Sequence, residues 1–122
     1  SWGVRNIQND TQQQDYSRAL TYLLKSMDKT RLVSSNDGWE QISETDICAV
    51  HDYTMVPSTM DKFDDMDTIL KTTPDSRMLF AVGNQYQKQP IVMTEYGGIA
   101  FVKEDETGWG YGDKVVGEKD FL

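Results

Sequence analysis

The sequence predicts an α/β fold in which parallel strands are covered by helices. Two observations support this prediction. Segments with helical spacing of apolar residues alternate with short apolar runs, and such alternation is typical of parallel sheets, whose strands are joined by helical crossovers. The apolar runs also end in polar or aromatic residues, and α/β enzymes place their chemistry at the carboxyl ends of parallel strands.

The first expected element is a helix over residues 10–27, with Asp10 or Thr11 as its N-cap. Apolar side chains recur along it at steps of three and four residues and form one stripe: Tyr16, Ala19, Leu20, Leu23, Leu24 and Met27. We expect this stripe to be buried. A brief strand is predicted over residues 32–35, and the turn residues Asn36-Asp37-Gly38 end it.

The next strand is predicted over residues 47–53. Its first half, Ile-Cys-Ala-Val, suits a strand that is buried on both faces. Its polar end consists of His51, Asp52 and Tyr53. A second helix should follow over residues 60–71, where four apolar side chains share one face: Phe63, Met66, Ile69 and Leu70.

The clearest strand covers residues 90–94, and Glu95 stands at its end. Residues 78–86 before it could be the last turns of a helix or an extended segment. After Tyr96 the sequence changes character, because six of the nine glycines lie there. A loop of this length is uncommon in a compact domain unless it serves a site or is disordered.

Composition argues against several classes of protein. The 12 basic and 20 acidic residues give a net charge of -8, whereas nucleic acids are bound by clustered Lys and Arg. No apolar run approaches the roughly 18 residues needed to cross a bilayer, and the first residues lack the layout of a signal peptide. The compartment is therefore not fixed, with the cytoplasm slightly favoured. One cysteine and one histidine leave no multi-ligand zinc set, so neither a metal nor another cofactor is expected.

Glu95 is the strongest candidate for chemistry. A carboxylate after a buried strand lies at the bottom of a cleft, and Gly97-Gly98 let the backbone turn away, as suits a carboxylate that attacks an anomeric carbon. The alternative is a glutamate that caps the strand or pairs with a lysine. Tyr53 ends the neighbouring strand, so its phenol could hydrogen-bond and orient Glu95, or its ring could be half-buried with a solvated hydroxyl.

Other polar and aromatic residues are weaker candidates. His51 could donate to a sugar hydroxyl, although a structural histidine is the more common case. Asp52 points to the opposite side of its strand and would support the site from behind. The faces of Trp2, Trp39 and Trp109 suit stacking on sugar rings, and the last two lie in loops expected at one mouth. Burial in the core is the usual fate of tryptophan and the alternative here.

Four motifs stand in order along the chain: Ser1-Trp2-Gly3-Val4, Ser34-Ser35-Asn36-Asp37-Gly38-Trp39-Glu40, His51-Asp52-Tyr53-Thr54 and Thr94-Glu95-Tyr96-Gly97-Gly98-Ile99-Ala100-Phe101. Together they resemble the second half of the catalytic barrel of family-two glycoside hydrolases, which include β-galactosidases, β-glucuronidases and β-mannosidases. The resemblance covers nearly the whole chain, and the motif around Glu95 is its most specific part.

The resemblance implies an α/β fold that is a partial (β/α)8 TIM barrel, roughly strands five to seven with their covering helices. Residues 1–122 would be the C-terminal half of the domain, without strands one to four and eight. It implies that Glu95 is the nucleophile of a retaining exo-β-glycosidase, β-galactosidase-like, and that Tyr53 contacts it. The expected substrate-binding residues are those of the motifs together with one loop tryptophan: His51, Asp52, Trp39, Trp109 and Asn36.

The resemblance also limits what the chain could do alone. The family's acid/base is a glutamate in an Asn-Glu pair that would directly precede residue 1, so the isolated chain is expected to be inactive. A half-barrel exposes unpaired strand edges, which predicts self-association or association with the missing barrel segments. The alternatives are a non-catalytic carbohydrate-binding module, against which two amphipathic helices argue, and a scaffold domain without a sugar site. Sugar, linkage, metal dependence and oligomeric state are not fixed.

Overall fold

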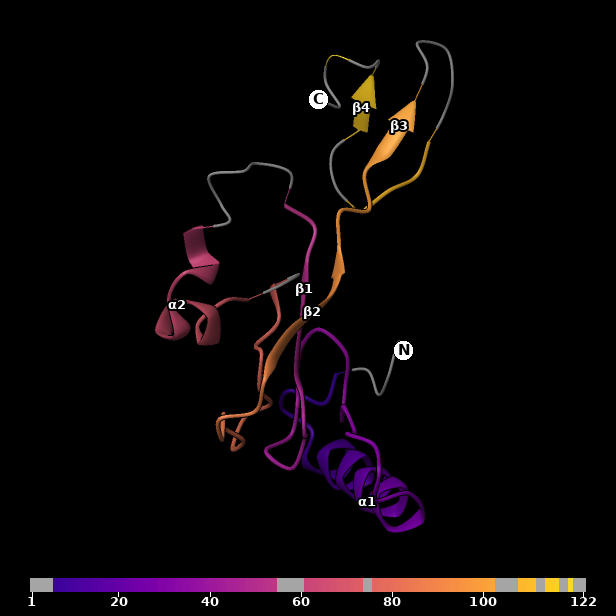
Figure 1. The fold of residues 1–122 in the computed structure, drawn as a ribbon, viewed down its shortest axis with the longest axis vertical. Helices are drawn as coiled ribbons and strands as arrows, with labels where there is room; N and C mark the ends of the chain where they lie inside the picture. The colour runs from indigo at the N-terminus through magenta and orange to yellow at the C-terminus, as the bar shows by residue number, and fades with distance from the viewer. Residues whose placement is uncertain are drawn as a thin grey trace.

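This computed structural model describes residues 6–54, 61–73, 76–102, 108–111, 114–116 and 119. Trp2, one of the three tryptophans considered for sugar stacking, lies outside them. The elements follow in the order α1 (Thr11–Met27), β1 (Cys48–Asp52), α2 (Met66–Leu70), β2 (Ile91–Tyr96), β3 (Ala100–Val102) and β4 (Lys114–Val116), as Figure 1 shows. Strands β1 and β2 form one parallel pair and β3 and β4 a second, so the described residues form no closed barrel.

Helix α1 has the predicted extent. Asp10 is its N-cap, and the Asp10 carboxylate accepts a hydrogen bond of 3.1 Å from the backbone N–H of Gln13. The prediction that the apolar stripe is buried is wrong, because all six of its residues are exposed: Tyr16, Ala19, Leu20, Leu23, Leu24 and Met27.

The buried face of α1 is polar instead and consists of Gln14, Ser17 and Thr21. It packs on irregular backbone, whose carbonyl groups need hydrogen-bond donors. Gln14 Nε2 donates to the carbonyl of Ile7 at 3.0 Å, and Ser17 Oγ donates to the carbonyl of Ser35 at 3.3 Å. The backbone on which the helix lies therefore selects its polar side.

The parallel pair β1–β2 confirms the two strands predicted for residues 47–53 and 90–94. Strand β1 is buried along most of its length, and β2 alternates between half-buried and exposed positions. The core lies against β1 and combines side chains from three parts of the chain: Cys48, Val50, Ile69, Leu79 and Phe80.

The strand predicted over residues 32–35 is wrong, because this segment has no ladder partner among the residues that the structure describes. The N–H of Val33 donates to the Asp46 carboxylate at 2.9 Å, and the carbonyl of Val33 accepts from the Asp46 N–H at 2.9 Å. Beside β1, the buried side chain of Gln41 replaces a strand. Gln41 Oε1 accepts from the N–H of Ala49 at 3.1 Å, and Gln41 Nε2 donates to the carbonyl of Ala49 at 2.9 Å.

The second helix is shorter than predicted. A 3₁₀ turn covers residues 61–63, and α2 begins only after Asp65, whose carboxylate accepts from the N–H of Thr68 at 2.9 Å. Of the four apolar side chains expected on one face, Met66 is exposed and the others contribute to the core. Residues 78–86 are extended rather than helical, with a bridge between Phe80 and Gln41.

The region after Tyr96 was expected to be a loop, and it contains the short strands β3 and β4. Gly97 and Gly98 have φ angles of 77° and 72°, which other residues rarely adopt, and they form the turn between β2 and β3. Among the described residues, no helix is long and apolar enough to cross a membrane.

Candidate active site

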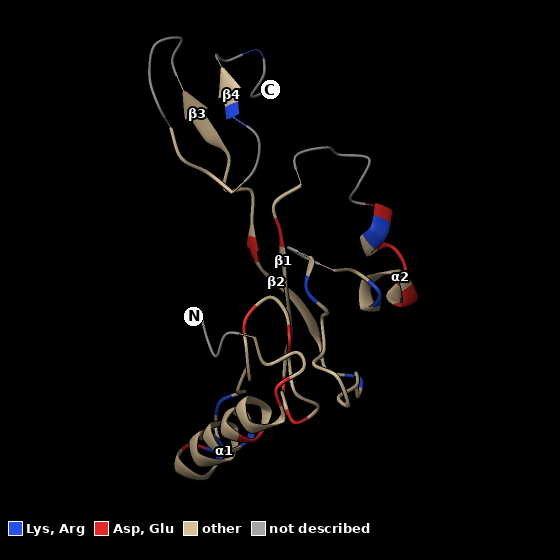
Figure 2. Cartoon of the chain, turned by 180° about the vertical axis from the view of Figure 1, so that it is seen from behind, with Lys and Arg blue, Asp and Glu red and all other residues tan. Residues whose placement is uncertain are grey.

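The carboxyl ends of β1 and β2 lie side by side and carry acidic residues, as Figure 2 shows. A β-bulge decides which residues meet there. Val50 pairs with Met93, but the next pair is His51 with Glu95, so Thr94 is passed over. Such an extra residue locally re-aims side chains. The bulge thereby sets Glu95 opposite His51 at the end of the pair.

The carboxylate of Glu95 is held by Tyr53. Tyr53 Oη donates to Glu95 Oε2 at 2.6 Å, a short hydrogen bond to a charged acceptor. Burial raises the pKa of the Tyr53 phenol, and the bond to Glu95 raises it further. The hydroxyl therefore keeps its proton and remains a donor well above neutral pH. The Glu95 side chain is 39% exposed, which leaves it accessible to a ligand.

His51 lies behind this pair and is 7% exposed. Its Nδ1 is 3.2 Å from Tyr53 Oη, and its Nε2 is 3.9 Å from Glu95 Oε1. Tyr53 has one hydroxyl proton, and Glu95 is the closer acceptor, so Nδ1 is placed to donate to the phenol oxygen. A hydrogen-bond chain thus runs from His51 through Tyr53 to Glu95.

The loop before β1 covers the other side of the imidazole. Gly38 has a φ of 79°, and a Cβ there would lie 2.5 Å from Cγ of His51, so only glycine lets the loop approach this closely. The next residue, Trp39, packs its indole edge-on to His51 at a centroid distance of 5.0 Å. Gly38 and Trp39 together fix the orientation of the ring.

Asp37 belongs to the same loop and was not predicted as a site residue. Its Oδ1 lies 3.3 Å from His51 Nε2 and accepts from Thr94 Oγ1 at 2.5 Å. Burial is the largest single influence and acts to raise the pKa of Asp37, but the Thr94 hydrogen bond and the interaction with His51 lower it overall. Asp37 is therefore held as a carboxylate.

Aromatic rings extend from Tyr53 toward solvent. Tyr111 stacks on Tyr53 with centroids 4.5 Å apart, and Trp109 meets Tyr111 edge-on at 4.8 Å. Gly98 permits this approach, because a Cβ there would lie 2.9 Å from Cδ2 of Tyr111. Trp109 is 77% exposed, so its face is open at the rim, and the stacked Tyr111 and Tyr53 rings connect it to Glu95.

Two predicted site residues bond elsewhere. Asn36 is buried, and its Nδ2 donates to the carbonyl of Trp39 at 3.0 Å, which closes the loop. Asp52 forms an ion pair of 2.8 Å with Lys62 and also accepts from Thr54. Both of these side chains brace backbone or a neighbouring side chain near the site.

The structure thus brings Glu95, Tyr53, His51 and Trp39 into one constellation. The residues that sequence reasoning missed there are Asp37, Thr94 and Tyr111. Asp37 carried a weak signal, since it stands between Asn36 and Gly38 in a predicted turn. The position of Thr94 depends on the bulge, which leaves no pattern in the sequence. The Gly97-Gly98 turn was expected, but the packing of Tyr111 against Gly98 was not.

A possible cation set exists at the same place. In the part of the chain that the structure describes, Asp37, His51 and Glu95 offer ligand atoms that all lie within 4.8 Å of one another. Two carboxylates and an imidazole suit a divalent transition metal. Without a metal, the arrangement provides an accessible carboxylate with Oε2 bound by a phenol and Oε1 3.9 Å from the His51 ring.

Comparison with known proteins yields a family. Residues 2–103 match the family described as "Glycosyl hydrolases family 2, TIM barrel domain". No curated protein and no solved structure matches the chain. The match includes Tyr53, Glu95 and the loop that carries Asp37.

Proposed function

The chain belongs to glycosyl hydrolase family 2, within its TIM-barrel domain, and we propose that Glu95 is the nucleophile of a retaining exo-β-glycosidase. The substrate would be a terminal β-linked sugar, as for a β-galactosidase. In the proposed barrel, β1 is the sixth strand and β2 the seventh. The observation that carries this proposal is the 2.6 Å hydrogen bond from Tyr53 to Glu95 at the carboxyl ends of adjacent parallel strands.

The proposed reaction has two steps. Glu95 Oε1 forms a bond to the anomeric carbon while the bond from that carbon to the leaving oxygen breaks, and a general acid gives the leaving oxygen a proton. Water then attacks the same carbon, loses a proton to the conjugate base of that acid, and displaces the carboxylate. Two inversions retain the anomeric configuration. Tyr53 would hold the carboxylate in position before attack and stabilise it again as it leaves.

The general acid is a separate requirement. In retaining enzymes, its carboxyl group lies about 5–5.5 Å from the nucleophile and needs a raised pKa. Asp37 is close enough, but its pKa is lowered, which is the wrong direction for an acid. We place the acid on the glutamate of the family's Asn-Glu pair, and we expect the 122-residue chain alone to be inactive for lack of it.

The neighbouring side chains would bind the sugar. His51 is oriented by Trp39 and Gly38, and its Nε2 lies 3.9 Å from Oε1 of the reacting carboxylate, where it could accept a hydrogen bond from a sugar hydroxyl. The exposed indole of Trp109 would stack on the substrate at the rim. Asn36 and Asp52 would act by bracing the loop and the end of β1.

A covalent trap tests the proposal. The full-length protein that carries this sequence would be incubated with a 2-deoxy-2-fluoro β-glycoside bearing a good leaving group, which slows the second step more than the first. Peptide mass spectrometry should find the sugar on Glu95. The matched control, Asp64→Asn, changes an exposed carboxylate elsewhere and should leave labelling intact, whereas Glu95→Gln should abolish it. Labelling of another carboxylate would refute the assignment.

The exposed face of Trp109 favours a second candidate, a carbohydrate-binding module without catalysis. In that case Trp109→Ala would abolish sugar binding, and Glu95→Gln would change neither binding nor any turnover. Isothermal titration of both variants with the same saccharide would separate the two functions.

A further inference from the structure

One ring nitrogen of His51 is buried beside two carboxylates. His51 is 7% exposed, and its Nε2 is buried and forms no hydrogen bond with another described residue. Most buried polar atoms have such a partner, so this nitrogen requires an explanation. The nearest charged atoms are Oδ1 of Asp37 at 3.3 Å and Oε1 of Glu95 at 3.9 Å, and all three atoms lie within 4.8 Å of one another.

The tautomer of His51 makes this nitrogen an acceptor. Nδ1 is placed to donate to the hydroxyl oxygen of Tyr53, because the one proton of that hydroxyl goes to Glu95. In a neutral imidazole, the second nitrogen then carries a lone pair. A lone pair and two carboxylate oxygens therefore converge, and a cation between them would satisfy all three.

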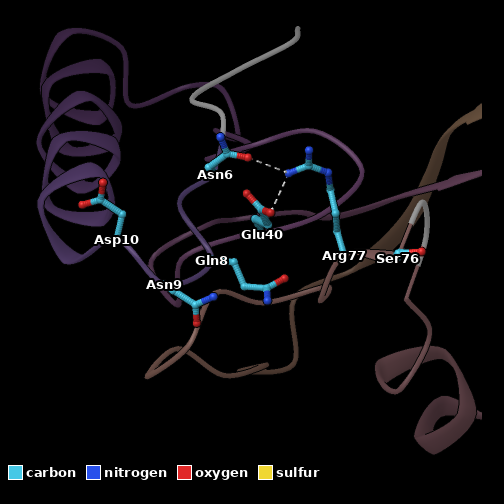
Figure 3. A pocket seen from close by; sticks show the side chains of 7 residues that line it. All are labelled: Asn6, Gln8, Asn9, Asp10, Glu40, Ser76 and Arg77. Atoms are coloured by element: carbon cyan, nitrogen blue, oxygen red, sulfur yellow. Dashed lines mark hydrogen bonds and ion pairs between the residues drawn. The ribbon is translucent and has the colours of Figure 1, made fainter.

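A second acid near this loop is neutralised by the protein itself. Glu40 is 2% exposed, and Figure 3 shows its carboxylate paired with the guanidinium of Arg77, at 2.7 Å. Its other oxygen accepts from the N–H of Ile7 at 3.0 Å. Glu95 differs, because no lysine or arginine among the residues that the structure describes forms an ion pair with it. Glu95 can therefore take a cation from solution.

The spacing of the three atoms suits a zinc-like ion. Bonds of about 2.0–2.1 Å at tetrahedral angles place neighbouring ligand atoms about 3.3 Å apart, and the atoms of Asp37 and His51 already have this separation. Glu95 must approach by roughly 0.6 Å, which its 39% exposed side chain allows. Two carboxylates balance the charge of a divalent ion, and the nitrogen ligand favours zinc over magnesium or calcium.

Two of the three ligands are held in place before any ion binds. Side chains that bind metals usually form a further hydrogen bond that fixes their orientation. Nδ1 of His51 lies 3.2 Å from the Tyr53 hydroxyl, and Trp39 packs edge-on to the imidazole. Asp37 accepts from the hydroxyl of Thr94 at 2.5 Å. An ion would therefore meet a preformed pair of ligands, and only Glu95 would need to move.

We propose that Asp37, His51 and Glu95 bind a divalent transition-metal ion such as Zn²⁺, and that this ion reversibly inhibits the enzyme. The ion occupies Oε1 of Glu95, the oxygen that would otherwise attack the anomeric carbon, so the ion and the substrate exclude each other. Inhibition rests on the proposed function, whereas ion binding does not.

Binding is tested on the full-length protein after treatment with a chelator. Isothermal titration with Zn²⁺ compares wild type with Asp37→Asn and Glu95→Gln, each of which replaces a charged ligand by a neutral one of the same shape. Asp64→Asn is the matched control, because it makes the same change at an exposed carboxylate outside the cluster. Both ligand variants should bind Zn²⁺ more than about tenfold more weakly, since even changes to the neighbours of a ligand cost about 10–100-fold. Asp64→Asn should match wild type.

Inhibition is measured with an aryl β-glycoside. Zn²⁺ should raise the KM of wild type and of Asp64→Asn without changing kcat, and the inhibition constant of Asp37→Asn should rise by the same factor as its dissociation constant. Zn²⁺ binding that all variants share, or binding that does not compete with substrate, would overturn the proposal. If wild type hydrolyses no glycoside, the proposed function is wrong and titration decides the metal site: weaker binding in both ligand variants supports it, and unchanged binding refutes it.

Discussion

Replacing Tyr53 by phenylalanine should lower kcat/KM about tenfold. The change deletes the hydroxyl that donates to Glu95 at 2.6 Å and keeps the ring that stacks on Tyr111. Hydrogen bonds to charged groups contribute about 1.5–3 kcal/mol. Because the Glu95 side chain is 39% exposed, water can partly replace the phenol, which favours the lower end. About 1.5 kcal/mol corresponds to roughly tenfold in rate.

The assay is steady-state hydrolysis of an aryl β-glycoside by the full-length protein at several pH values. Tyr96→Phe is the matched control, because Tyr96 directly follows Glu95, is 75% exposed, and its hydroxyl forms no hydrogen bond with another described residue. The kcat/KM of Tyr53→Phe should be lower than that of wild type at every pH up to mildly alkaline values, since the raised pKa keeps the phenol of wild type protonated. A Tyr53→Phe rate within twofold of Tyr96→Phe would show that the hydrogen bond does not assist catalysis.

Three further predictions concern the loop and the helix. Gly38→Ala should cost about 1–3 kcal/mol in the free energy of unfolding, measured with urea, because its Cβ meets the His51 ring at a positive φ. Asp37 has a lowered pKa, so it stabilises the fold above its unfolded pKa of about 3.9. Asp37→Asn should be less stable than wild type at pH 7, and the difference should shrink as pH falls through the folded pKa; a constant difference would contradict this. Leu23 is 53% exposed on α1, and we expect Leu23→Lys to reduce self-association of the 122-residue chain in light scattering, with Lys29→Ala as the surface control.

The parts of the fold that could be predicted from sequence are those set by local signals. Strands β1 and β2 are short apolar runs between turn residues, and α1 directly follows its N-cap, Asp10. The strand over residues 32–35 had a similar signal but has no ladder partner among the described residues, and beside β1 the Gln41 side chain bonds the backbone of Ala49. Whether a side chain such as that of Gln41 bonds the edge of a strand in place of another strand depends on tertiary packing, so no local sequence pattern predicts it.

Some features of the candidate site also follow from local signals, and others depend on tertiary packing. The approach of Tyr53 to Glu95 follows from two parallel strands that end side by side, which the alternation of elements predicts. The pairing of His51 with Glu95 requires the bulge at Thr94, and the position of Asp37 requires a loop to fold back over β1. Both arise from packing between distant segments. The sequence therefore indicated Glu95 and its hydrogen-bond donor Tyr53 but missed Asp37, which lies beside them.

The buried polar face of α1 supports the loop that carries part of the candidate site. The loop between α1 and β1 carries Asp37, Gly38 and Trp39 against His51, and irregular backbone of this kind has few internal hydrogen bonds. Buried polar side chains supply the missing partners: Ser17 bonds to Ser35, Asn36 to Trp39, and Thr45 to Ser35 and Ile47. An apolar helix face would leave the half-buried carbonyl of Ser35 without this partner, at a cost of about 1 kcal/mol. The polar side of the helix therefore faces inward, because the backbone carbonyl groups of this loop accept hydrogen bonds from it, which an apolar face could not donate.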